Sequence, residues 1–179
     1  MNISEVKTAK RVGEFVLVDG SRLGFEWDHS FSSNERRSPN PRVYLFTVNG
    51  VIYKIGGSES KGGILSTLNF YINARSGSPG PSRFVTYGLI FRELSLGNRV
   101  EVYLISSPGT RMKVCGLFDC EEELEVYPFR ASERRCLDDY RKKTGEFPPW
   151  NFKERGEEYP EDLYNEFLDY HKKRTQSKK

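Results

Sequence analysis

Residues 43–56, VYLFTVNGVIYKIG, constrain the fold of this 179-residue chain more than any other stretch. Two runs rich in β-branched and aromatic residues flank Asn49 and Gly50. This dipeptide tolerates positive φ at both central positions of a type I′ turn, and such runs on either side of it are typical of a β-hairpin. The sequence therefore predicts two antiparallel strands joined by a two-residue turn.

The turn also predicts how the two strands pair. An unbroken register puts Phe46 across from Tyr53, and Tyr44 across from Ile55. Tyr44 and Tyr53 then share one face as diagonal neighbours, and Lys54 points to the other face. Taken alone, the hairpin fits a packed sheet edge with exposed phenol groups as well as it fits a functional site.

The hairpin carries two short motifs that resemble the paired signatures of the GIY-YIG nuclease family. The first is Val43-Tyr44, and the second is Ile52-Tyr53-Lys54-Ile55-Gly56. The predicted elements across residues 42–151 also resemble that family's order of strand, strand, helix, helix, strand, helix. The resemblance implies an α+β fold in which helices flank a small central antiparallel sheet.

The chain departs from the family's motifs at two places. Arg42 stands where the family's first glycine stands, and the second motif is one residue longer than Tyr-Ile-Gly. Either Tyr53 fills the second tyrosine position with a bulge behind it, or Lys54 fills it, as lysine does in some restriction enzymes of the family. The alternation of side chains between the two faces of the hairpin favours Tyr53, because it puts Tyr53 on the face of Tyr44. The strict spacing of the motif favours Lys54.

The remaining elements follow from apolar spacing and turn residues. We expect an N-terminal hairpin and polar loop in residues 1–41, a core in 42–155 with an insertion near 106–130, and a C-terminal helix with a basic tail in 156–179. The expected strands are 14–19, 22–27 and 99–105. The expected helices are 64–75, 83–96 with Ser82 as N-cap, one opening at Glu133, and one after Pro160 with Leu163, Tyr164, Phe167 and Leu168 inward. The tail from residue 172 is expected to be disordered.

Glu133 carries the sharpest chemical signal outside the hairpin. Leu137 and Tyr140 follow it by four and seven positions, which puts the carboxylate in line with the apolar stripe of its helix. An inward carboxylate needs a partner, either the positive end of the helix dipole or a divalent cation. The resemblance places the family's metal-binding glutamate on this helix, and so implies that Glu133 binds Mg²⁺ or another divalent cation such as Mn²⁺.

The resemblance implies hydrolysis of a phosphodiester bond with Tyr44 as the general base. A free phenol has a pKa of about 10, so an ionised phenol near neutral pH costs roughly 4 kcal/mol unless cations lie close. Tyr53 as a hydrogen-bond donor, Lys54 and the metal are the groups available to help.

An arginine should hold the scissile phosphate, and the family's usual position for it is occupied here by residues 62–64. We predict that Arg83 takes this role at the start of its helix, with Arg75 as the second choice. Lys61, in the glycine-rich connector 58–63, and Asn151, where the family often has an asparagine, are predicted to contact DNA. The connector lacks the spacing of a P-loop, so no nucleotide cofactor is expected.

Composition limits the remaining possibilities. A formal net charge of +3 permits a nucleic-acid partner without requiring one. No apolar run is long enough to cross a bilayer and no secretion signal is evident, so we expect a cytoplasmic protein without a membrane partner. Cys115, Cys120 and Cys136 are then expected to be reduced thiols, with no structural zinc site.

The favoured hypothesis is therefore a Mg²⁺-dependent endonuclease acting on double-stranded DNA, of the type II restriction class. One site per chain implies a homodimer or successive nicking. A catalytically degenerate DNA-binding module and a repair or homing nuclease are the alternatives. The enzyme hypothesis requires the hydroxyl of Tyr44 and the carboxylate of Glu133 to converge on one cleft.

Overall fold

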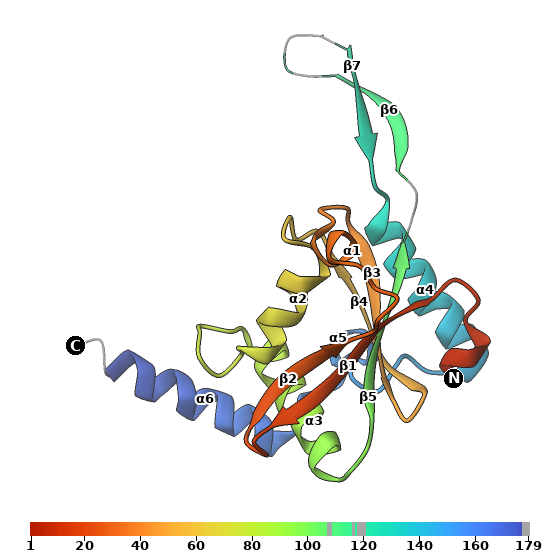
Figure 1. The fold of residues 1–179 in the computed structure, drawn as a ribbon. Coiled ribbons are helices and arrows are strands. Elements are labelled where there is room, and N and C mark those ends of the chain that lie inside the picture. Colours follow the sequence, from red (N-terminus) through yellow and green to blue (C-terminus); the bar gives the residue numbers. More distant parts are fainter. Residues whose placement is uncertain (107–108, 116, 118–120, 177–179) are drawn as a thin grey trace.

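The computed structural model describes residues 1–106, 109–115, 117 and 121–176. A five-stranded antiparallel sheet with the order β2-β1-β5-β3-β4 forms its centre (Figure 1). The strands are β1 (Lys10–Val18), β2 (Arg22–Trp27), β3 (Arg42–Val48), β4 (Val51–Ser58) and β5 (Val100–Ser106). Helices cover both faces, which confirms the predicted α+β class. Every helix in the described ranges is too short or too polar to cross a lipid bilayer.

The N-terminal hairpin belongs to the main sheet, because β1 pairs with β5 as well as with β2. A 3-10 turn, η1 (Ile3–Glu5), precedes it. The polar stretch after β2 contains a short helix, α1 (Ser33–Arg37), which packs against the next helix of the chain. Phe31 anchors this segment with 3% exposure, so the segment is part of the folded body.

Alternation along β3 divides the core into two clusters. Tyr44 and Phe46 face α2 (Gly63–Ile72) and α3 (Pro81–Ser95), where Leu68 and Val85 complete the larger cluster. The side chains of Val43, Leu45, Leu137 and Tyr140 form the other cluster, beneath α4 (Phe129–Thr144).

Two predicted helix starts differ from the structure. Proline suits the first turn of a helix, so α3 begins at Pro81 with Gly80, not Ser82, as N-cap. Helix α4 begins four residues before Glu133.

The predicted insertion contains a two-stranded sheet of β6 (Thr110–Cys115) and β7 (Glu121–Val126). Figure 1 shows it projecting away from the body of the molecule. Met112 pairs with Leu124 across its strands. Cys120, one of the three expected reduced thiols, lies outside the described residues.

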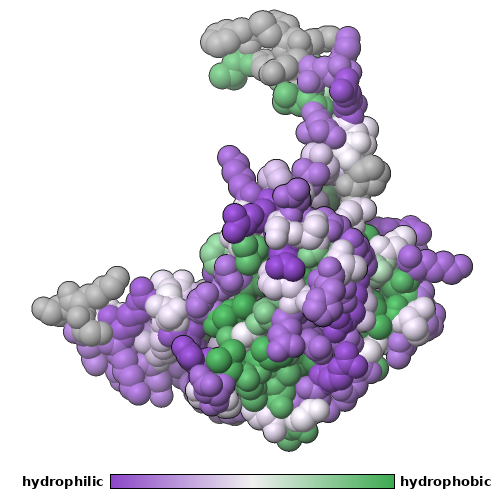
Figure 2. Space-filling view, viewed as in Figure 1, coloured by the Kyte–Doolittle hydropathy of each residue, from purple (hydrophilic) through white to green (hydrophobic). Residues whose placement is uncertain are grey.

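A short helix, α5 (Phe152–Arg155), and a long one, α6 (Glu161–Gln176), complete the chain. Leu163 packs against Gly88 of α3. A Cβ atom on Gly88 would lie 2.6 Å from Cδ2 of Leu163, so the two helices approach closely here. Tyr164 and Leu168 are 39% and 47% exposed, so their predicted inward position is wrong, because α6 contacts the body along a narrow stripe. The helix runs to Gln176, so the expectation of disorder from residue 172 is also wrong up to that point. Most of the α6 surface is hydrophilic, whereas apolar residues gather where Figure 1 places β1, β2 and α3 (Figure 2).

The central hairpin has the predicted turn but a different register. Asn49 and Gly50 have φ angles of 48° and 80°, as a type I′ turn requires. The register shifts after the first two pairs beyond the turn, so Phe46 faces Lys54 and Tyr44 faces Gly56. The predicted pairing of Phe46 with Tyr53 and of Tyr44 with Ile55 is therefore wrong.

Candidate active site

A β-bulge decides which side chain of β4 joins Tyr44. Tyr53 is the extra residue in β4, because the register jumps from Ile52 to Lys54. Residues opposite one another in a ladder share a face, so Lys54 lies on the face of Phe46 and Tyr44. The ring of Tyr53 packs edge-on against Trp150 with centroids 5.3 Å apart. Lys54, not Tyr53, lines the cavity at this edge of the sheet.

The cavity has a volume of about 220 Å³ and lies along β4, the edge strand. Elements from both faces of the sheet and from the C-terminal segment contribute to its wall. The polar side chains in the wall are those of Tyr44, Lys54, Tyr71, Ser82, Glu133, Asn151, Lys153, Glu154 and Tyr159. The predicted pair, Tyr44 and Glu133, therefore meets at one cavity.

Tyr44 is a buried phenol that shares a hydrogen bond with a second phenol. Its hydroxyl lies 2.7 Å from that of Tyr71 on α2. Burial raises the pKa of Tyr44 well above its ordinary value of 10.0, and Tyr71 and Glu133 raise it further, whereas Arg83 lowers it. A Cβ atom at Gly56 would lie 2.5 Å from the Tyr44 hydroxyl oxygen. The glycine of the second motif therefore leaves room for this hydroxyl.

Glu133 reaches the same cavity from the opposite face of the sheet. Its Oε1 accepts a hydrogen bond from the backbone N–H of Gly57 at 2.6 Å. A Cβ atom at Gly57 would lie 2.4 Å from its Oε2. Tyr44 and Glu133 thus approach β4 from its two sides, and Gly56 and Gly57 supply the space between them. The helix dipole does not account for Glu133, which lies beyond the first turn of α4.

The carboxylates of Glu133 and Glu154 share the cavity with the buried ammonium group of Lys54. Burial raises the pKa of Glu133, and the negative charge of Glu154 raises it further, against the lowering effects of the Gly57 N–H, Lys54 and Arg130. Burial lowers the pKa of Lys54, and the opposing effect of the negative charges of Glu154 and Glu133 is smaller. Lys54 Nζ donates to the Trp150 carbonyl at 3.4 Å. The cavity therefore holds a buried cation between two acidic side chains.

Asn151 fixes the C-terminal segment to β4. Its Oδ1 accepts from the Ile55 N–H at 2.9 Å, and its Nδ2 donates to the Ile55 carbonyl at 2.8 Å. The same Nδ2 donates to Glu154 at 3.2 Å. The Trp150 N–H adds a bond to the Tyr53 carbonyl at 2.8 Å. Both amide hydrogens of Asn151 are thus used within the protein, and its predicted contact with DNA stays a prediction.

The predicted basic residues lie at or beyond the margin of the cavity. Arg83 stacks over the ring of Phe70 at 4.3 Å, and its neighbour Ser82, not Arg83 itself, lines the wall. Arg75 is held by Glu166 of α6 at 2.5 Å, away from the wall. Lys61 is exposed in the connector before α2. Arg83 remains the better candidate for phosphate, because its charge reaches Tyr44 and Tyr71.

The residues present suit a divalent cation with oxygen ligands. Of the two Glu133 oxygens, Oε1 is bonded to Gly57, and Oε2 has no hydrogen-bond partner among the described residues. Glu154 offers a second carboxylate in the same wall. A cation would offset the burial and the repulsion from Glu154 that raise the pKa of Glu133, and Mg²⁺ keeps several waters when one or two carboxylates bind it. Within the described ranges, acidic, histidine and cysteine side chains form no metal-binding group of three or more.

Sequence reasoning did not assign five of the polar wall residues to the site: Tyr71, Ser82, Lys153, Glu154 and Tyr159. Tyr71 lies three positions after Leu68, so the apolar stripe of its helix carried a signal for an inward position. Glu154 lies in a four-residue helix, which is too short for a periodic pattern to place it.

Comparison with known proteins supports the architecture. No protein-family profile and no curated protein sequence matches the chain. Among solved structures, it is similar to a mutant of bacteriophage T4 EndoII, with a TM-score of 0.57 and 16% identity over 84% of this chain and 98% of that chain. It is also similar to the restriction endonuclease HPY188I in complex with product DNA, with a TM-score of 0.48 and 16% identity over 83% of this chain and 84% of that chain. The likeness to T4 EndoII shows a shared fold along almost the entire length of that protein.

Proposed function

We propose that this chain is a divalent-metal-dependent DNA endonuclease of the GIY-YIG type, acting on duplex DNA as a type II restriction enzyme does. The observation that carries the proposal is the convergence of Tyr44 and Glu133 on one cavity from opposite faces of the sheet. The shared fold with T4 EndoII, a phage endonuclease, supports it. The HPY188I structure contains product DNA, and duplex DNA is the substrate we propose here.

Tyr44 is the proposed general base. In the structure its phenol is neutral at ordinary pH, because burial raises its pKa. A proton can leave Tyr44 only when positive charge lies close, and Lys54 shares its face of the hairpin. The Tyr71 hydroxyl, 2.7 Å away, can donate a hydrogen bond to the phenolate. The Tyr44 phenolate would then accept a proton from the attacking water, with the Tyr71 hydroxyl and the Lys54 ammonium group stabilising its negative charge.

Glu133 is the proposed metal ligand, with Glu154 beside it in the wall. A divalent cation bound there would supply charge stabilisation at the phosphoryl group and the departing oxygen. The Gly57 N–H fixes the Glu133 carboxylate through Oε1, which leaves Oε2 available to bind a cation. Arg83 is the proposed phosphate-binding arginine, since a guanidinium pairs with phosphate through two parallel hydrogen bonds.

Incubation of the protein with supercoiled plasmid tests the proposal. We expect cleavage with Mg²⁺ or Mn²⁺, none with EDTA, and none by Glu133→Gln. Asp138→Asn is the matched control, because Asp138 is exposed on the same helix and lines no part of the cavity. Equal cutting by wild type and Glu133→Gln would contradict the proposed metal-binding role of Glu133. Absence of cutting with every divalent metal would contradict the proposed endonuclease activity.

One observation favours a second candidate, a DNA-binding module without catalysis. No arginine is found among the described residues that line the cavity, although phosphoryl transfer usually employs one. Salt-sensitive duplex binding without cleavage in the same assay would support this candidate. A homodimer is also proposed. Two measurements would test it: cleavage of both strands at one position, and the mass of the protein in solution.

A further inference from the structure

Arg42, the residue that replaces the first glycine of the motif, is buried with few partners. It is 5% exposed, and Nη2 donates to the Ser60 carbonyl at 3.1 Å. This is the one hydrogen bond of its side chain with the described residues, although a guanidinium carries five N–H donors. Burial lowers the pKa of Arg42, and no carboxylate of the described chain offsets this effect. A guanidinium nevertheless stays protonated, so its charge lacks a counterion.

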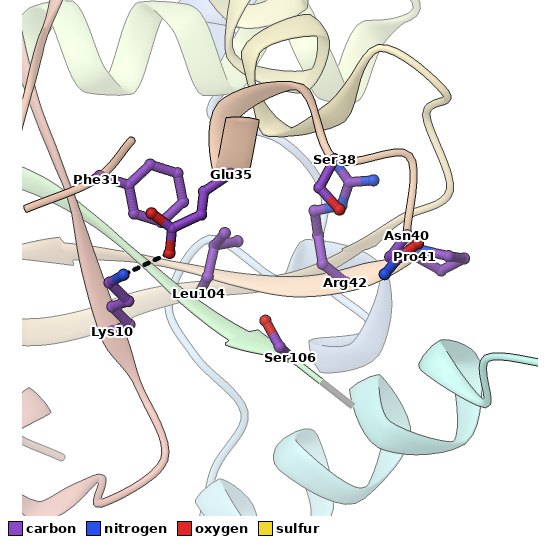
Figure 3. Close-up of a pocket in the computed structure, with 9 residues that line it drawn as sticks. All are labelled: Lys10, Phe31, Glu35, Ser38, Asn40, Pro41, Arg42, Leu104 and Ser106. Atoms are coloured by element: carbon purple, nitrogen blue, oxygen red, sulfur yellow. Dashed lines mark hydrogen bonds and ion pairs between the residues drawn. The ribbon is translucent and has the colours of Figure 1, made fainter. Parts of the chain in front are cut away.

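Arg42 borders a second cavity, of about 150 Å³, between β3, β5, β1 and the segment around α1. Figure 3 shows Arg42 reaching from β3 toward Ser38, with Leu104 between Arg42 and Lys10. Nine residues line this cavity: Lys10, Phe31, Glu35, Ser38, Asn40, Pro41, Arg42, Leu104 and Ser106. Ser38, Asn40 and Ser106 add hydrogen-bonding groups to the wall.

The remaining charges of this wall cancel. Lys10 Nζ lies 2.5 Å from Glu35 Oε1, and the other Glu35 oxygen accepts from the backbone and hydroxyl of Ser32 (Figure 3). Glu35 is thus committed to Lys10 and to the cap of α1. The net charge of the lining residues is one positive unit, which comes from Arg42. A cavity with this charge and several hydrogen-bonding groups favours a small anion.

The second cavity lies beside the candidate active site. Arg42 precedes Tyr44 by two positions on β3, so the two side chains leave the strand on the same face, about 7 Å apart along it. Arg42 pairs in the ladders with Ser58 of β4 and Ser106 of β5. A nucleic-acid strand at the Tyr44 cavity repeats its phosphates every few ångströms. A neighbouring phosphate of the same strand would therefore be in reach of Arg42.

We propose that this cavity binds an oxyanion of the phosphate class, with Arg42 as its principal ligand. The oxyanion is either a backbone phosphate of bound DNA or free inorganic phosphate. The first source rests on the proposed function, and the second does not. Arg42 would then be a binding residue separate from Arg83, and it would add one phosphate contact to the duplex interface.

Two measurements on Arg42→Met test the proposal. The first is the shift in Tm with inorganic phosphate, against sodium chloride at equal ionic strength. The second is the affinity for duplex DNA as a function of salt, measured without divalent metal so that no cleavage occurs. Arg22→Met is the control, because Arg22 is a mostly exposed arginine at the far edge of the sheet. Arg42→Lys, which keeps the charge with fewer donors, is the second variant in case methionine prevents folding.

We expect Arg42→Met, and to a lesser extent Arg42→Lys, to lose at least one of two wild-type responses. Loss of the phosphate-dependent Tm shift identifies free phosphate as a ligand. A fall of about one in the salt slope of DNA binding identifies a backbone phosphate. A merely structural Arg42 would lower Tm equally in both salts and leave the salt slope unchanged, and that result overturns the proposal. Plasmid cleavage by wild type is scored separately, so loss of the phosphate response in a protein that does not cut would overturn the nuclease and keep the oxyanion site.

Discussion

Tyr44 and Glu133 stand on opposite faces of the central sheet and still line one cavity, because two consecutive glycines form the strand edge between them. Gly56 lies against the hydroxyl of Tyr44, and Gly57 lies against the carboxylate of Glu133. A side chain on either residue would occupy the space through which the two groups meet. The geometry of the proposed active site therefore depends on the edge strand as much as on the side chains.

Gly56→Ala tests this dependence. The added Cβ would lie 2.5 Å from the Tyr44 hydroxyl oxygen, so we expect a loss of about 1–3 kcal/mol in the free energy of unfolding, together with loss of cleavage. Urea denaturation and plasmid cleavage measure the two effects. Gly77→Ala is the control, since the nearest atom to its Cβ is the Asn73 carbonyl oxygen at 4.0 Å. Full activity of Gly56→Ala would mean that the Tyr44 hydroxyl is free to move away.

Lys54→Met and Tyr53→Phe separate the two candidates for the second tyrosine position. Lys54 lies in the cavity, so its replacement should lower the cleavage rate about 100-fold or more. The free energy of unfolding of Lys54→Met should equal or exceed that of wild type, because a buried ammonium group is removed. The Tyr53 hydroxyl lies outside the cavity wall, so Tyr53→Phe should cut at the wild-type rate. The opposite ranking of single-turnover rates would return the role to Tyr53.

Glu133→Gln should change stability in a pH-dependent way. Burial and Glu154 raise the pKa of Glu133 above its ordinary value of 4.5, so the folded state holds this proton more tightly than the unfolded state does. Wild-type stability therefore decreases as pH rises from 4.5 through the raised pKa. We expect the variant to match wild type well below pH 4.5 and to exceed it in Tm at pH 7 without metal. A variant that is less stable at pH 7 than at pH 4, relative to wild type, would show that the carboxylate is not disfavoured by burial.

Addition of Mg²⁺ or Mn²⁺ should reverse that order. A ligand that binds the folded state alone stabilises it by about 2.7 kcal/mol at a hundredfold excess over its Kd. Wild-type Tm should rise with metal, and the Tm of Glu133→Gln should change little, as followed by differential scanning calorimetry. Glu154→Gln should show an intermediate shift, because Glu154 is the second carboxylate of the wall. Equal shifts in all three proteins would place the metal elsewhere.

Local patterns predicted the turn and the orientation of Glu133. Positive φ at Asn49 and Gly50 is a property of those residues, and the structure has it. Leu137 and Tyr140 are both buried, as the helical spacing from Glu133 indicated. These features involve residues close together in the chain, and for this reason a single sequence can reveal them.

The register of the hairpin could not be predicted in the same way. The predicted register assumed that the strands pair without interruption, whereas Tyr53 forms a bulge in β4. The bulge is held from the free side of β4 by Trp150 and Asn151, almost a hundred positions along the chain. Contacts over this separation leave no periodic signal near Tyr53. The bulge puts Lys54 on the face of Tyr44, the residue that the strict spacing of the motif favoured, and its role at the second tyrosine position stays a prediction.

The most direct test of the central claim is a double-mutant cycle on single-turnover cleavage of a duplex with Mg²⁺, using Tyr44→Phe, Glu133→Gln and their combination. Groups that act in one chemical step are strongly non-additive. We predict that each single variant loses a factor of about 100 or more, and that the double variant is no slower than the worse single variant. Loss factors that multiply in the double variant, or wild-type rates in either single variant, would contradict a shared site.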